Sequence, residues 1–179
     1  MKHRSSVPVS KGLRFTSRMV RGLQRTFPRL YAKVAKHEGR KWGDSSIPWT
    51  PVKKPVTESR VALITTGGII LKTQEPFNLN DPKGDSSYRE IPGDASGEDL
   101  VVSHLFYDHT EVEVDTEIMF PLQALHTLQA KGEIGEVARR HFSFNGGISD
   151  PTLLIERHAP DVAQQLVADQ VDLALLTPA

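Results

Sequence analysis

The stretch Arg60-Val61-Ala62-Leu63-Ile64-Thr65-Thr66-Gly67-Gly68 decides the fold of this chain of 179 residues. Four apolar residues run directly into two hydroxyl residues and two glycines. This order is typical of a buried strand of an α/β sheet and the tight turn at its carboxyl end, where glycine allows close backbone approach to a ligand. The stretch is neither a GxGxxG fingerprint nor a P-loop, so a cradle for phosphate or carboxylate and a purely structural turn both stay open.

A second stretch of the same kind is Val171-Asp172-Leu173-Ala174-Leu175-Leu176-Thr177-Pro178-Ala179. Its apolar run follows a helical pattern and leads into Thr-Pro, which is typical of a buried central strand. In a parallel sheet the chemistry lies just past the carboxyl ends of such strands. We therefore expect a functional site where these two strands end.

Apolar runs alternate with helical patterns between these two stretches. The patterns predict strands over 100–106 and 134–140, helices over 120–131 and 151–167 with a kink at Pro160, and a long ordered loop over 72–99. Strands that alternate with helices are typical of a Rossmann-like or flavodoxin-like α/β fold. We expect a mainly parallel sheet flanked by helices and joined by right-handed crossovers.

Charge divides the chain into unlike parts. Residues 1–60 carry 15 Lys and Arg against 3 Asp and Glu, whereas residues 61–179 carry 7 against 19. From Leu13 to Val34 the apolar residues follow a rough helical period that breaks at Pro28, with arginines on the other face. The sequence therefore predicts three parts. They are a basic, partly helical N-terminal extension (1–44), a proline-rich strap (45–59) and an α/β domain (60–179).

The basic extension also raises the question of partners. We expect it to pack on the acidic domain of its own chain, although a basic arm can also contact an acidic partner, RNA or an anionic membrane surface. No run approaches the roughly 18 apolar residues of a membrane span, and the basic N-terminus shows no apolar signal core. We therefore expect a cytoplasmic protein with no membrane or nucleic-acid partner. Cysteine is missing, which excludes disulfides, thiolate metal sites and a cysteine nucleophile from these residues.

Acid–base side chains gather after the second predicted strand. His104, Asp108, His109 and Asp115 lie within twelve positions. Their spacing matches no specific metal motif, and a closed zinc site would favour cysteine. A metal site, a catalytic or substrate-binding histidine oriented by an aspartate, and a structural cluster all stay open.

Two further segments combine polar side chains with glycine. Arg140-His141-Phe142-Ser143-Phe144 leads into Asn-Gly-Gly, and His141 faces the crevice of His109 if both strands belong to one parallel sheet. A capped turn with a surface histidine is the alternative. Gly84 to Arg89 carries mixed donors and acceptors, which suit either recognition of a small polar substrate or a solvated loop.

Seven motifs in this order together resemble one protein family. They are Ile47-Pro48-Trp49-Thr50-Pro51, Val61 to Gly68, Gly84-Asp85 with Ser87-Tyr88-Arg89, His104 with Tyr107-Asp108-His109, Phe120-Pro121-Leu122, Arg140-His141 with Ser143-Phe144, and Val171 to Pro178. The chain resembles the selenoprotein B family of glycine, sarcosine, betaine and D-proline reductases over roughly residues 45 to 179. It is more similar to the D-proline branch than to the glycine branch.

The resemblance implies reductive cleavage of a C–N bond in a small amine or amino acid. In that chemistry a pyruvoyl group on a partner subunit activates the amine, a selenolate attacks the adjacent carbon, and a thiol resolves the selenium adduct. A selenol is more acidic than a thiol, so it is ionised at neutral pH and is the better nucleophile.

The resemblance also implies selenocysteine or cysteine directly after the strand that ends in Thr177-Pro178. Selenocysteine is encoded by UGA, which is ordinarily read as stop. We therefore expect selenocysteine just after Ala179 and an α/β domain that is incomplete at its C-terminal end. Without that nucleophile the chain as given is expected to be inactive, and no cofactor is expected to bind within it.

The resemblance and the motifs together give the expected site. The substrate-binding residues are expected to be Thr65, Thr66, Gly67, Gly68 and Ser143. The catalytic residues are expected to be Asp108, His109 and His141, with one of the two histidines as proton donor to the leaving amine. No metal site is assigned. The alternative function is a non-catalytic binding or scaffold domain whose basic arm docks an acidic partner.

Overall fold

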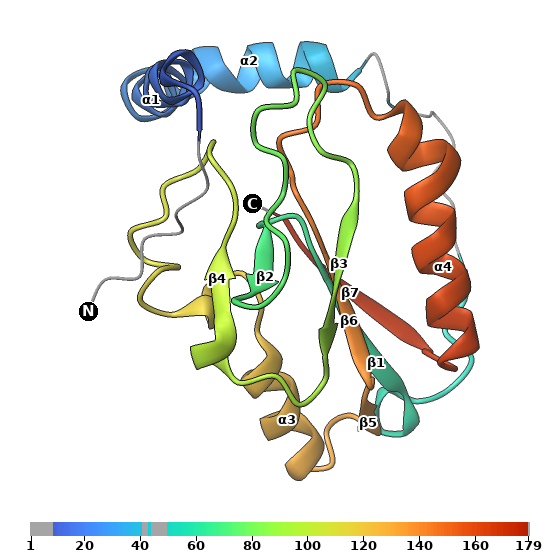
Figure 1. The fold of residues 1–179 in the computed structure, drawn as a ribbon. Helices are drawn as coiled ribbons and strands as arrows, with labels where there is room; N and C mark the ends of the chain where they lie inside the picture. Colours follow the sequence, from blue (N-terminus) through green and yellow to red (C-terminus); the bar gives the residue numbers. More distant parts are fainter. Residues whose placement is uncertain (1–8, 41–42, 44–49, 179) are drawn as a thin grey trace.

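The computed structural model describes residues 9–40, 43 and 50–178, and it shows a mixed α/β fold in which helices flank a curled sheet (Figure 1). The predicted strap is described only from residue 50, where the 3-10 helix η1 (Val56–Glu58) leads into the first strand. The predictions for residues 45–49, including most of the Ile-Pro-Trp-Thr-Pro motif, lie outside the described residues.

The main sheet is built around β1 (Arg60–Thr65). Along one edge β1 pairs in parallel with β7 (Leu173–Thr177), and along the other it pairs in parallel with β5 (Glu136–Val137) and then β6 (Arg140–Phe144). Strand β3 (Tyr88–Pro92) pairs with β6 in the antiparallel direction. A mainly parallel sheet flanked by helices is therefore present, while a Rossmann-like or flavodoxin-like class stays a prediction.

The predicted strand over 100–106 lies outside this sheet. It is reduced to β4 (Leu100–Val102), which pairs with β2 (Ile69–Leu71) in a separate antiparallel pair. The Gly67-Gly68 turn directs the chain away from β1, because Gly68 takes a φ of +66° that favours glycine. A shared crevice for His109 and His141 requires that the strands before them belong to one parallel sheet. Because β4 lies outside the main sheet, this requirement is not met.

The loop predicted over 72–99 contains a strand, so that prediction is wrong at β3. The ring of Tyr88 packs against the rings of Phe142 and Phe144 at centroid distances of 5.8 and 5.9 Å. Tyr88 and its strand are therefore fixed by contacts with β6, which is distant in the sequence. Local composition, rich in proline, glycine and aspartate, did not reveal this pairing.

Strand β7 forms where the sequence predicts it, and it is partly exposed in the described part of the chain. Within the described part of the chain it pairs with β1 alone, and Leu175 and Leu176 are 45% and 67% exposed. A central position of this strand stays a prediction. An apolar run can mark a strand without showing how many neighbours cover it.

Helices lie on both faces of the main sheet. Leu63 packs in one core cluster with Leu122 and Leu125, whereas its neighbour Ile64 packs with Val162 in another, because successive strand residues face opposite sides. The helices concerned are α3 (Leu122–Ala130) and α4 (Ala159–Ala168), the latter preceded by the π-helical turn η4 (Leu154–His158). Gly132 follows α3 with a φ of +71°, as the sequence predicts for a glycine that ends a helix.

The remaining elements are short turns and two N-terminal helices. The turns are η2 (Gly97–Asp99) and η3 (Thr116–Ile118), and the helices are α1 (Lys11–Thr26) and α2 (Pro28–Gly39). Figure 1 shows α1 and α2 together at one end of the molecule, away from α3 and β5. The guanidinium of Arg21 donates to the carbonyl oxygen of Tyr107 at 3.5 Å, so α1 contacts the α/β part.

A buried carboxylate joins the amino end of β6 to the end of α4. Asp169 is 5% exposed, and its carboxylate accepts from Arg139 Nε at 2.8 Å and from Arg140 Nη2 at 3.1 Å. Burial by itself raises the pKa of Asp169, but the hydrogen bonds and charges of Arg140 and Arg139 outweigh it and lower the pKa below its ordinary value.

Replacing this carboxylate tests the junction. Asp169→Asn removes the carboxylate shared by two guanidinium groups, so we expect a loss of about 2–3 kcal/mol of unfolding free energy. The loss is smaller than for a fully buried pair because Arg139 is largely exposed and Arg140 keeps its contact with Glu90 at 3.3 Å. Urea unfolding measures the loss. Asp161→Asn on α4 is the matched control, because that side chain is 45% exposed and makes a single ion pair at 4.0 Å. Equal stability of the two variants would contradict the prediction.

Candidate functional site

The turn at the carboxyl end of β1 is fixed to the end of β7. The buried hydroxyl of Thr65 donates to the carbonyl oxygen of Thr177 at 3.1 Å and accepts from the N–H of Gly67 at 3.0 Å. The N–H of Thr66 donates to the same Thr177 oxygen at 3.1 Å. The predicted turn is therefore present and these polar groups hold its shape, while substrate binding by it stays a prediction.

Gly68 allows a second segment to approach this turn. A Cβ atom at Gly68 would lie 2.6 Å from the carbonyl oxygen of Ser103, and the N–H of Ser103 donates to the carbonyl oxygen of Gly68 at 2.7 Å. The close approach made possible by glycine is thus to the chain's own backbone. It places the segment after β4 directly against the turn.

Three rings on this segment pack together beside the turn. The Tyr107 ring lies 4.5 Å from that of His109 and 4.8 Å from that of His104. The Tyr107 hydroxyl donates to the carbonyl oxygen of Gly67 at 2.9 Å. Burial raises the pKa of Tyr107, and Glu113 adds to the effect, so the phenol stays protonated and remains a donor. Tyr107 therefore attaches both histidines to the β1 turn.

His104 is the most buried of these histidines, at 6% exposure. Its Nδ1 accepts from the N–H of Phe106 at 3.1 Å, so the neutral ring carries its proton on Nε2. Burial, followed by the charge of His109, lowers the pKa of His104 to about 4. At neutral pH the ring is consequently a neutral N–H donor.

The Nε2 atom of His104 has no hydrogen-bond partner among the described residues. It lies beneath the exposed Gly146, where an added Cβ would be 3.4 Å away. A buried donor without a partner is costly, which makes this position a candidate for contact with a ligand. The sequence placed His104 in the acid–base cluster but did not include it among the site residues. Its spacing of three residues from Tyr107 is the signal that was available.

His109 and Asp108 lie at the exposed side of this ring cluster. Burial lowers the pKa of His109, Glu113 opposes that shift, Arg21 adds to it, and Asp108 opposes it. The Asp108 carboxylate accepts from the N–H and the hydroxyl of Thr110 at 3.1 and 2.6 Å. Asp108 therefore caps the next turn, and it acts on His109 through charge.

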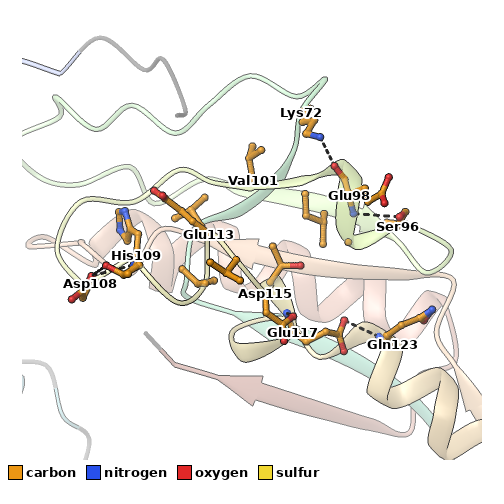
Figure 2. Close-up of a pocket in the computed structure, with 18 of the residues that line it drawn as sticks. Lys72, Ser96, Glu98, Val101, Asp108, His109, Glu113, Asp115, Glu117 and Gln123 are labelled. Carbon is orange, nitrogen blue, oxygen red and sulfur yellow. Dashed lines mark hydrogen bonds between the residues drawn. The ribbon is translucent and has the colours of Figure 1, made fainter. Parts of the chain in front are cut away.

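A groove of about 1210 Å³ extends from His109 along the protein surface. Figure 2 shows Asp108 and His109 at one end and Glu117 with Gln123 at the other. Two basic residues, Arg21 and Lys72, also line it. Six carboxylates line the groove: Asp94, Glu98, Asp108, Glu113, Asp115 and Glu117. The excess of negative charge favours a cationic group such as an ammonium ion.

Ser143 lies beside Thr65 on the neighbouring strand, since the two residues are paired in the parallel register of β6 and β1. Its hydroxyl is fully buried and has no partner among the described residues. Thr177 is paired with Thr65 on the other side, and its hydroxyl donates to the carbonyl oxygen of Met119 at 2.7 Å. Ser143 thus supplies an unused donor in a row of three hydroxyl residues.

His141 lies farther back in the sheet. It is fully buried, its Nδ1 accepts from the N–H of Leu63 at 2.9 Å, and its ring packs edge-on against Phe120 at 5.8 Å. The alternative of a surface histidine is therefore wrong. Burial, followed by His126, lowers the pKa of His141 to about 4. The structure gives His141 different neighbours from His109, and its catalytic role stays a prediction.

The segment from Gly84 to Arg89 braces its own loop. Arg89 donates to the carbonyl oxygens of Glu75 and Pro76 at 2.8 and 3.2 Å, and its guanidinium lies 4.4 Å from the Phe77 ring centroid. Asp85 accepts from the N–H of Asn78 at 2.7 Å. These contacts give the segment a structural role, and substrate recognition by it stays a prediction.

The described part of the chain has neither a cluster of several metal ligands nor a membrane-spanning helix. No group of three or more His, Asp or Glu side chains in that part of the chain is placed to hold a metal ion. No helix there is long and apolar enough to cross a membrane.

The buried His141 predicts a pH dependence of stability. Its pKa is about 4 when folded and about 6.5 when unfolded. The unfolded state therefore binds more protons between these values, and the unfolding free energy falls as pH drops from 7 to 4. His141→Asn keeps an acceptor near the N–H of Leu63 but cannot protonate. We expect the fall between pH 7 and 4, measured by urea unfolding, to shrink by about 3 kcal/mol.

The exposed His37 on α2 offers the matched control for this experiment. His37→Asn should leave the pH dependence of the parent chain in place. An unchanged pH dependence in His141→Asn would show that His141 is not buried in its neutral form.

Comparison with known proteins gives a consistent result. A family model described as glycine/sarcosine/betaine reductase selenoprotein B matches residues 41–179. D-proline reductase subunit gamma of Acetoanaerobium sticklandii is 42% identical over 129 residues, which cover 72% of this chain and 52% of that protein. Glycine reductase complex component B subunit gamma of Peptoclostridium acidaminophilum is 25% identical over 126 residues, which cover 69% of this chain and 28% of that protein.

Sarcosine reductase complex component B subunit beta of Peptoclostridium acidaminophilum is 27% identical over 138 residues, which cover 73% of this chain and 30% of that protein. The chain thus spans about half the length of the D-proline reductase subunit and less than a third of the other two. No solved structure gives a significant match. The matched range includes the β1 turn, the ring cluster and the groove apart from Arg21.

Proposed function

The chain belongs to the glycine/sarcosine/betaine reductase selenoprotein B family, and from that premise we propose that it forms the substrate-site wall of a B-type reductase subunit that cleaves a C–N bond. The 42% identity to D-proline reductase subunit gamma carries this proposal. The donors without partners at His104 and Ser143 support it. The acidic groove begins at His109, whose ring centroid lies 6.2 Å from that of His104.

The proposed substrate is an amino acid of the D-proline type, since the relative at 42% identity is named for that activity. An amino acid has a carboxylate and an ammonium group. The buried N–H of His104 and hydroxyl of Ser143 suit the carboxylate, because both are donors without partners in the described structure. The acidic groove beside His109 suits the ammonium group.

The reaction opens the ring by breaking the bond between the α-carbon and nitrogen of D-proline. Two electrons and two protons are added, and the product is 5-aminopentanoate. We assign His109 as the proton donor to the leaving nitrogen. Burial lowers its pKa, and the negative charges of Glu113 and Asp108 oppose that shift and favour the protonated ring. The β1 turn holds the end of β7 in place through the carbonyl oxygen of Thr177.

The proposal retains the two groups that the family chemistry requires. A selenocysteine just after Ala179 would supply the nucleophile, and a pyruvoyl group on a partner subunit would activate the amine. The described residues fit the first group, because both Thr65 and Thr66 fix the backbone at Thr177 beside the ring cluster. A residue shortly after this point would therefore begin close to the proposed site.

The test uses the native gene product purified with its partner subunits from selenium-labelled cells. With a dithiol as reductant, we expect formation of 5-aminopentanoate from D-proline and little reaction with L-proline, glycine, sarcosine or betaine. Selenium should migrate with the polypeptide. C–N cleavage of another of these amines would replace the substrate assignment. The absence of cleavage with all of them would contradict the proposed function.

The role of His109 has its own test in the same preparation. His109→Gln removes the proton donor but keeps an amide of similar reach, so we expect kcat to fall about 100-fold while KM for D-proline changes little. His158→Gln is the control, because His158 contacts Ser86 at 3.1 Å and does not line the groove. Equal kcat values for the two variants would remove His109 from the mechanism.

A further inference from the structure

The two N-terminal helices expose a row of large apolar side chains. Each of these side chains is between 38% and 65% exposed. They are Phe15, Met19, Leu23, Phe27, Leu30 and Val34. Helix α1 has another face on which Ser17 is buried and Leu13 and Val20 are half-buried. The apolar row, here called the apolar ridge, therefore faces away from the core that the arm helps to cover.

Spacing explains why each helix carries a row of exposed apolar residues. Phe15, Met19 and Leu23 are four residues apart, so they lie along one side of α1. Leu30 and Val34 repeat the spacing on α2. The sequence predicted one apolar face from Leu13 to Val34, but the structure separates a buried face from the exposed ridge.

Positive charge accompanies the ridge. Lys11 to Lys36 contains eight Lys and Arg and no Asp or Glu. Exposed basic residues directly precede four of the apolar ones, in the pairs Arg14-Phe15, Arg18-Met19, Arg29-Leu30 and Lys33-Val34. Helices that combine a basic stripe with exposed Phe, Leu and Met are typical of binding in the plane of a membrane interface.

Other occupants fit the ridge less well. A second copy that paired ridge to ridge would bring the basic stripes of both copies together, and like charges at that distance repel. A surface shared by related reductase subunits would fall within residues 41–179, but the ridge lies before this range. A lipid surface supplies anionic phosphates and an apolar layer, and it demands no shape complementarity from a convex pair of helices.

We propose that α1 and α2 form a docking surface for an anionic lipid membrane. The ridge enters the boundary between headgroups and acyl chains, and the arginines beside it bind lipid phosphates. The helices lie in the interface and do not cross it. From the sequence we expected the arm to pack on its own domain and to have no membrane partner, whereas the exposed ridge favours a membrane surface. Because α1 and α2 form one end of the molecule, the α/β part projects away from the lipid (Figure 1).

The test is sedimentation of the full chain with vesicles of phosphatidylcholine and phosphatidylglycerol at a ratio of about 7:3, compared with phosphatidylcholine alone. We expect at least tenfold stronger partitioning onto the anionic vesicles, and a large loss of binding at high salt. Phe15→Ser with Met19→Ser should lower the partitioning at least tenfold. Both side chains are exposed, so the double variant should unfold at the same urea concentration as the parent.

Leu153→Ser with Ile155→Ser is the matched control, because these side chains are 58% and 57% exposed outside the arm. The control should bind within twofold of the parent. The proposal is overturned if anionic vesicles bind no better than neutral ones, or if both double variants bind alike. It is also overturned if the ridge variant abolishes self-association, or binding of an acidic protein, while vesicle binding is absent. The assay uses no substrate, so its outcome is separate from that of the reductase proposal.

Discussion

The hydroxyl of Thr65 holds three parts of the molecule in register. It accepts from Gly67 within the turn, donates to Thr177 at the end of β7, and belongs to the strand that every other parallel strand joins. In the same turn, the carbonyl oxygen of Gly67 accepts a hydrogen bond from the Tyr107 hydroxyl. A shift at Thr65 would therefore move the end of β7 and the ring cluster together. The position of the site depends on this buried side chain.

Burial sets the chemistry of the histidines around that turn. The Nδ1 atoms of His104 and His141 both accept backbone N–H groups, which leaves the proton on Nε2 in each neutral ring. The two rings differ in what surrounds the remaining N–H. His104 lies beneath an exposed glycine at the edge of the sheet, whereas His141 lies in the core against Phe120. Neither N–H has a hydrogen-bond partner among the described residues, but that of His104 lies near the exposed Gly146, so we propose the ligand contact there.

The sequence predicted those features that depend on local order. The strand and turn from Arg60 to Gly68, the helix that ends before Gly132 and the strand from Leu173 are confirmed, because each is encoded by neighbouring residues. The place of His141 was not predictable, since it depends on the register between β6 and β1. The pairing of β4 with β2 and that of β7 with β1 likewise depend on contacts between distant segments.

The exposure of side chains and the grouping of charges also depend on contacts between segments that are distant in the sequence. Apolar periodicity predicted a helical arm, but one face of α1 is partly buried and another carries the exposed ridge. The spacing of His104, Tyr107 and His109 gave a cluster, yet only the structure shows that Tyr107 attaches it to Gly67. The residues that line the acidic groove come from segments that are separate in the sequence, so no single motif predicted the groove.

The central claim is that the β1 turn and the ring cluster form one amino-acid site with a neutral Nε2–H donor at His104. Nitrogen NMR of the native gene product, labelled on histidine and titrated with D-proline, tests it most directly. The account predicts Nε2–H tautomers for His104 and His141 at pH 7, with ligand-induced shifts at His104 and His109 and none at His141. A proton on Nδ1 of His104, or shifts that leave both His104 and His109 unchanged, would contradict the account.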